Sequence, residues 1–127
     1  MSINTMLKIT ALLSLLLLTL HLSDDIVRGI SKAESSNVAL VVLAVLLYGT
    51  LVLPGRRWGY VITLVVGLMA AGVPVLHMRG ANYPDIAASA GGFFFVWTLW
   101  ALGGIGGATM LLSVQGLWSL RRGGARH

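Results

Sequence analysis

The sequence predicts an all-α fold, an integral membrane four-helix bundle with four transmembrane helices and both termini in the cytoplasm. Hydrophobic residues make up 57% of the 127 positions and charged residues 10%, whereas soluble domains carry about 25% charged residues. A chain this short cannot bury so much apolar surface in its own core. The mean hydropathy of +0.87 and the division of the apolar residues into four segments complete the case for lipid as the solvent.

The four apolar segments predict one transmembrane domain over residues 1–127, with helices at about 6–28, 37–53, 58–79 and 92–120. A spanning helix needs about 20 residues, with a range of about 17–25. The apolar parts of the first two segments are near the lower limit of that range. Strands are not expected, because the apolar residues do not alternate with polar ones and an open sheet edge is not viable in lipid.

The first segment has a second interpretation, since Lys8 followed by the apolar run Ala11–Leu20 is also typical of a secretory signal peptide. Cleavage of such a peptide needs small residues close behind the apolar run. The small-x-small site nearest to it is Ser31-Lys32-Ala33, which lies too far downstream. We therefore expect a retained helix.

The distribution of lysine and arginine predicts the orientation. With the N-terminus inside, six basic residues are cytoplasmic and three are external, the direction of the positive-inside rule. The chain is thus expected in the cell membrane as a multi-pass protein with cytoplasmic N- and C-termini. Its basic tail, residues 121–127, is expected to contact anionic lipid headgroups. The inner set is Lys8, Arg56, Arg57, Arg121, Arg122 and Arg126, and the outer set is Arg28, Lys32 and Arg79.

A group of ionisable residues is predicted at the outer end of the bundle. On the first helix it consists of His21, Asp24, Asp25 and Arg28, at the spacing i, i+3, i+4 and i+7 that places side chains on one helix face. The first and third helices of a hairpin bundle end on the same side. The third helix and the loop after it therefore add His77, Arg79 and Asp85 to this end.

Ionisable residues within spanning segments are costly and usually face the bundle interior or a wet cavity, so this group is a candidate site for a small polar ligand or an ion. A structural interpretation competes with it. Asp24 and Arg28 can form an i,i+4 ion pair, Arg79 can neutralise Asp25, and the histidines can hydrogen-bond across helices. The sequence alone leaves both interpretations open.

A metal site is a further interpretation, with His21, Asp24 or Asp25, and His77 as ligands and Asp85 as a possible addition. Imidazole and carboxylate together suit zinc, iron or manganese better than Cu(I). Haem held between His21 and His77 is the less favoured cofactor. Thiolate sites and disulfides are excluded, because the chain has no cysteine.

A glycine-rich stretch in the last helix predicts close helix packing. Gly103 and Gly107 form a GxxxG pattern, and small residues let helix backbones approach each other in lipid. We interpret it as the contact of a homo-oligomer, with packing inside the bundle as the alternative. The stretch is not a nucleotide loop, since no strand precedes it and no Lys-Ser/Thr follows it.

Function follows only in outline from these observations. The first hypothesis is a non-enzymatic membrane protein that binds or passes a small polar ligand or ion, as a homo-oligomer. The alternatives are a structural or accessory subunit beside a partner membrane protein, and a metal- or haem-binding membrane protein. Nucleic-acid binding is not expected, because the basic residues are scattered and not interleaved with aromatic ones. No nucleophile and base occur at a recognisable spacing, which argues against an enzyme.

Overall fold

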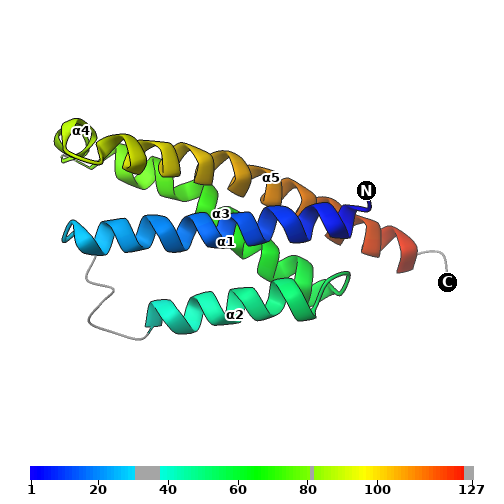
Figure 1. The fold of residues 1–127 in the computed structure, drawn as a ribbon. Helices are drawn as coiled ribbons and strands as arrows, with labels where there is room; N and C mark the ends of the chain where they lie inside the picture. Colours follow the sequence, from blue (N-terminus) through cyan, green and yellow to red (C-terminus); the bar gives the residue numbers. More distant parts are fainter. Residues whose placement is uncertain (31–37, 81, 125–127) are drawn as a thin grey trace.

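The computed structural model describes residues 1–30, 38–80 and 82–124, and the ordered elements in these ranges are all helices (Figure 1). Lys32, Arg126 and His127, which entered the sequence analysis, lie outside the described residues. The all-α class is therefore confirmed for the part of the chain that is described. In chain order the helices are α1 Ile3–Val27, α2 Val38–Val52, α3 Arg57–Met78, α4 Tyr83–Ala88 and α5 Gly92–Gly124.

Three of the helices, α1, α3 and α5, are long and apolar enough to cross a membrane. The fourth apolar helix, α2, has 15 residues. At about 1.5 Å per residue it extends about 22 Å, which is less than the hydrocarbon thickness of about 30 Å. The described part of the chain thus has three candidate spans and one shorter apolar helix, where the sequence led us to expect four spans. The additional helix α4, in the loop between α3 and α5, was not predicted.

The most extensive helix–helix contact in the bundle is between α3 and α5, and glycines lie in it. A Cβ atom added at Gly67 would collide with the backbone of Met110 and Gly106, and one added at Gly106 would collide with Ala70 and Ala71. The two backbones are therefore in direct contact. Since lipid provides no hydrophobic force between helices, this close approach supplies the van der Waals contact that holds them together.

The two ends of the bundle differ in what they contain. The N-terminus, the C-terminal end of α5 and the turn between α2 and α3 lie at one end, while α4 and the C-terminal ends of α1 and α3 lie at the other (Figure 1). The turn uses Gly55 at a φ of +78°, a conformation that glycine adopts without a Cβ clash. Because successive helices alternate in direction, α1 and α3 run the same way and their last turns come together, as expected from the sequence. This end of the bundle carries the candidate site.

Candidate functional site

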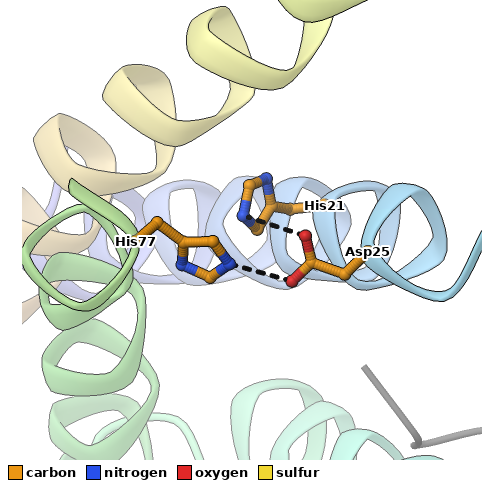
Figure 2. A group of neighbouring side chains, drawn as sticks. All are labelled: His21, Asp25 and His77. Carbon is orange, nitrogen blue, oxygen red and sulfur yellow. Dashed lines mark hydrogen bonds and ion pairs between the residues drawn. The ribbon is translucent and has the colours of Figure 1, made fainter. Parts of the chain in front are cut away.

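His21, Asp25 and His77 meet between the last turns of α1 and α3 (Figure 2). His77 Nε2 lies 3.0 Å from Asp25 Oδ2, and His21 Nε2 lies 3.8 Å from Asp25 Oδ1. The two imidazole rings are in edge contact, with centroids 4.8 Å apart. One ligand atom from each residue lies within 4.8 Å of the other two, so the three side chains form one group, named the His–Asp–His group below.

The His–Asp–His group is largely shielded from the surroundings of the protein. The side chains of His21 and Asp25 are 2% and 9% exposed, and that of His77 is 20% exposed. Phe95 of α5, which is fully buried, covers both rings at centroid distances of 5.1 Å and 5.7 Å. A charge or an unpaired polar atom at this depth is costly unless a partner compensates it.

The Nδ1 atoms of both imidazoles, which point away from Asp25, already have hydrogen-bond partners. His77 Nδ1 lies 3.0 Å from the Val73 carbonyl oxygen, which can only accept, so Nδ1 carries the proton. His21 Nδ1 lies 3.1 Å from the Thr98 hydroxyl. Thr98 donates its own hydrogen to the Phe95 carbonyl, so its oxygen accepts from His21. In both neutral imidazoles the proton therefore sits on Nδ1 and the lone pair on Nε2.

When both imidazoles are neutral, both Nε2 lone pairs face the Asp25 carboxylate, which also only accepts when it is ionised. A protonated His77 would instead donate from Nε2 to Asp25 Oδ2 over 3.0 Å. His21 Nε2 and Asp25 Oδ1 are buried and find no hydrogen-bond partner among the described residues. Leaving such an atom unsatisfied costs about 1–3 kcal/mol. A proton or a metal cation between these acceptors removes that cost, so the geometry calls for a positively charged occupant.

The spacing of the acceptor atoms matches a small metal ion. Bonds of about 2.0–2.1 Å to a tetrahedral ion place its ligand atoms about 3.3 Å apart, close to the distances of 3.0 Å and 3.8 Å to the two Asp25 oxygens. The three ligand atoms lie within 4.8 Å of one another, so the group would contract slightly around an ion. Hydrogen bonds from Nδ1 to a carbonyl and a hydroxyl are the second-shell contacts that orient metal-binding histidines. The edge contact between the rings leaves no space for a porphyrin between His21 and His77, so the arrangement favours a single ion over haem.

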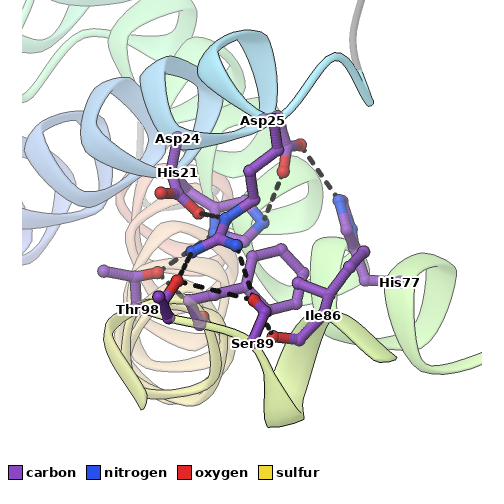
Figure 3. A network of polar contacts seen from close by, with 10 residues as sticks. His21, Asp24, Asp25, His77, Ile86, Ser89 and Thr98 are labelled. Carbon is purple, nitrogen blue, oxygen red and sulfur yellow. Dashed lines mark hydrogen bonds and ion pairs between the residues drawn. The ribbon is translucent and has the colours of Figure 1, made fainter. Parts of the chain in front are cut away.

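Asp24 lies beside this group (Figure 3) and, paired with Arg28, serves a different purpose. The Arg28 Nε atom donates to Asp24 Oδ2 over 2.7 Å, which is the i,i+4 pair expected from the sequence. The guanidinium also donates to the Ser89 hydroxyl over 2.9 Å and lies 5.8 Å from the centre of the Phe95 ring. Arg28 thus fastens the end of α1 to the segment between α4 and α5. The four ionisable residues of α1 divide into an inner pair, His21 and Asp25, and an outer pair, Asp24 and Arg28.

Arg79 and Asp85, the remaining predicted site residues, are not part of the His–Asp–His group. Both are exposed, Arg79 directly after α3 and Asp85 in α4. Asp25 is paired with the two histidines, and no ion pair between Arg79 and Asp25 is found in the described residues. Asp85 lines a cavity that also touches His77, so it lies near the site without being one of its ligands.

Two contributors from α5 were missed by the sequence analysis. Thr98 orients His21, and Phe95 covers both imidazoles. The sequence offered one indication of Thr98. It is a hydroxyl residue in the outer half of an otherwise apolar helix, at the depth of the two histidines. Phe95 stands in a run of bulky apolar residues that, from the sequence, could face lipid or a ligand, and it is fully buried.

The two glycines of the GxxxG pattern have different surroundings. A Cβ atom at Gly103 would lie 2.8 Å from Pro74 Cγ of the same chain, whereas one at Gly107 would meet nothing within 4 Å. Gly103 therefore packs inside the bundle, and Gly107 is open to a neighbour.

No protein family model matches this chain, and neither a curated protein nor a solved structure is detectably similar to it. What the His–Asp–His group does must be argued from its geometry.

Proposed function

We propose that this chain is a multi-pass membrane protein that binds one divalent transition-metal ion through His21 Nε2, Asp25 and His77 Nε2. The observation that carries the proposal is that both Nε2 atoms face one buried carboxylate while both Nδ1 atoms have hydrogen-bond partners elsewhere. Two imidazoles and a carboxylate suit zinc, iron or manganese. A cation of this kind converts three mutually repelling acceptors into three ligands.

The core next to the site favours binding over passage through a single chain. One helical turn deeper, Leu17 of α1 and Leu102 of α5 pack with Ala70 of α3 in a buried apolar cluster. The partly buried Val73 and Ile105 pack against it. A hydrated ion has no polar partner in such a layer, and its transfer into it is strongly unfavourable. The protein is therefore proposed to hold its ion and not to conduct it as a monomer.

The membrane placement is part of the same proposal. We place α2 as a fourth and short crossing, which local thinning of the bilayer accommodates. Both chain termini are then on the cytoplasmic side, where the positive-inside rule puts the basic residues at that end of the bundle. The His–Asp–His group is then just below the external surface of the membrane, and the ion comes from outside.

Homo-oligomer formation through α5 is also proposed, with a smaller contact than the full GxxxG pattern would give. Gly104 and Gly107 both face open space, so a second copy of α5 can approach the backbone there. Gly103 does not take part, because Pro74 occupies its surface. An accessory role beside a partner membrane protein would use the same open face.

Metal binding is tested on the full chain purified in nanodiscs and loaded with Co²⁺, whose visible absorption reports tetrahedral coordination. We expect one Co²⁺ per chain, displaced by Zn²⁺, and loss of the absorption in His77→Ala and Asp25→Ala. Asp85→Asn is the matched control, since Asp85 is exposed and outside the ligand group. Absence of stoichiometric Co²⁺ binding by the wild-type chain, or equal binding by all four proteins, contradicts the proposal.

A further inference from the structure

An open cavity of about 760 Å³ adjoins the His–Asp–His group at the α4 end of the bundle. It is bounded by the end of α1, the end of α3 and the segment that contains α4. Of the three proposed ligands, His77 is the one that lines it. Its other lining residues include Arg28, Leu76, Tyr83, Asp85 and Ile86.

Approach to the proposed ion is closed on two sides, by α5 and by the deeper core. Phe95 and Thr98 of α5 are both fully buried and in contact with the imidazoles. On the deeper side lies the apolar cluster that contains Leu17 and Leu102. His77 is also the most exposed of the three ligands, at 20%. The cavity, which His77 lines, is therefore the approach to the ion that the described residues leave open.

The coordination and the charge at the ion are both incomplete with protein ligands alone. Three protein ligands leave at least one position on a tetrahedral ion, which water or an added ligand takes. A divalent ion with one carboxylate and two neutral imidazoles retains one net positive charge in a buried site. Asp24 does not balance it, because its carboxylate is engaged by Arg28 over 2.7 Å. An uncompensated buried charge is strongly unfavourable.

We propose that a small anion, a carboxylate such as acetate, enters this cavity and completes the coordination of the ion held by His21, Asp25 and His77. This inference rests on the proposed metal site and names the class of its second ligand. The net positive charge of the ion attracts the anion, and Tyr83 on the cavity wall provides a hydroxyl along the path. Asp85 on the same wall is exposed, so solvent screens its repulsion of the anion.

The test titrates sodium acetate into the Co²⁺-loaded full-length protein at constant ionic strength, with sodium perchlorate as the salt control. We expect a saturable change in the visible spectrum with acetate and none with perchlorate. Filling the cavity with Ile86→Trp should weaken the acetate response at least about tenfold while Co²⁺ remains bound. Leu76→Trp, at a cavity-lining position that is 72% exposed, is the second variant and is expected to weaken the response in the same way.

Leu68→Trp is the matched control, because Leu68 is 62% exposed on α3 and does not line the cavity. It should keep the wild-type response. If Co²⁺ binds and acetate leaves its spectrum unchanged, the anion inference is wrong while the metal site stands. If acetate acts equally on wild type and on both cavity variants, the cavity is not the route and the inference also fails. Absence of any Co²⁺ spectrum is a failure of the proposed function instead.

Discussion

Between the middle of the bundle and the chain termini, the core contains hydroxyl pairs, whereas at the α4 end it contains the His–Asp–His group. Ser113 donates to Thr63 over 2.9 Å, and Thr63 donates in turn to the Gly59 carbonyl over 3.0 Å. Every hydroxyl there has an acceptor for its hydrogen. In the His–Asp–His group, by contrast, His21 Nε2 and Asp25 Oδ1 face each other without a donor.

This difference separates polar side chains with a structural role from the polar side chains of the proposed functional site. Hydroxyl pairs in a membrane core join helices and are complete as they stand. Three acceptors held together by packing and by oriented Nδ1 contacts are complete only with a cation. Burial alone would have grouped the two regions, since both contain fully or almost fully buried polar side chains. The assignment of donors and acceptors distinguishes them.

The largest expected effect is at Asp25, where function and stability should respond in opposite directions. Asp25→Asn removes the charged ligand, and we expect metal affinity to fall by more than about 100-fold, beyond what the loss of a second-shell contact costs. The metal-free protein should gain about 1 kcal/mol of stability, because the new amide donates to an imidazole Nε2 that previously faced an acceptor. Isothermal titration with Zn²⁺ and thermal unfolding in nanodiscs measure the two quantities.

Asp24→Asn is the control for that substitution, because it removes a neighbouring carboxylate that pairs with Arg28 and contacts no proposed ligand. Its metal affinity should stay within about threefold of wild type, as expected for a change outside the coordination shell. A metal-free Asp25→Asn protein that is clearly less stable than wild type would show that the acceptor-only assignment of the group is wrong.

The next effect concerns the glycine contact that holds α3 against α5 and so fixes His77 relative to Thr98. In Gly106→Leu, even the Cβ atom of the new side chain would lie only 2.6 Å from Ala70 Cβ. Overpacking of this kind costs about 1–3 kcal/mol. We expect a lower melting temperature together with weaker metal binding. Gly107→Leu, at the adjacent open position, should leave both unchanged.

Gly107→Leu also tests the proposed oligomer, since it changes the open face of α5 without touching the packing of the chain on itself. Cross-linking in membranes should show fewer oligomers for Gly107→Leu than for wild type. Equal cross-linking would remove α5 as the contact between copies. Equal stability of Gly106→Leu and Gly107→Leu would contradict the packing that the structure shows for α3 and α5.

The sequence was informative where one residue type at one spacing had one physical consequence. Composition and four apolar segments predicted an all-α membrane protein, and the alternating direction of the helices brought the ends of α1 and α3 together. The same argument placed His21 and His77 at one end, and the structure puts their rings 4.8 Å apart. These inferences needed only helix geometry.

Other features depend on rotation and depth, which spacing does not fix. His21, Asp24, Asp25 and Arg28 share a broad face at i, i+3, i+4 and i+7, yet the rotation of α1 divides them into a buried pair and an outer pair. Arg79 appeared able to reach Asp25, but it follows the last turn of α3 and is exposed. The sequence also does not define the exact ends of helices. It therefore could not predict that α2 is too short for a bilayer or that the loop before α5 contains the helix α4. Thr98 was missed because its partner is 77 residues away.

A smaller effect is expected from Thr98→Val, which removes the acceptor that orients His21 while preserving the shape of the side chain. Second-shell substitutions of this kind cost about 10–100-fold in metal affinity, and we expect the lower end because Asp25 and His77 are untouched. The Co²⁺ absorption should broaden as the His21 ring becomes free to rotate. Thr98→Ser, which keeps the hydroxyl, should restore wild-type affinity, and failure to do so would mean that packing against Phe95 is what matters.

The smallest effect is expected in the region with complete hydrogen bonding. Ser113→Ala removes one donor to Thr63, and interhelical hydrogen bonds in membrane proteins contribute about 0.6 kcal/mol on average. Thermal unfolding in nanodiscs should show a loss of about that size, and Zn²⁺ affinity should not change, because the apolar cluster of Leu17, Ala70 and Leu102 lies between the two regions. A change in Zn²⁺ affinity comparable to that of Thr98→Val would show that the two regions are coupled. The separation between structural and functional polarity would then have to be abandoned.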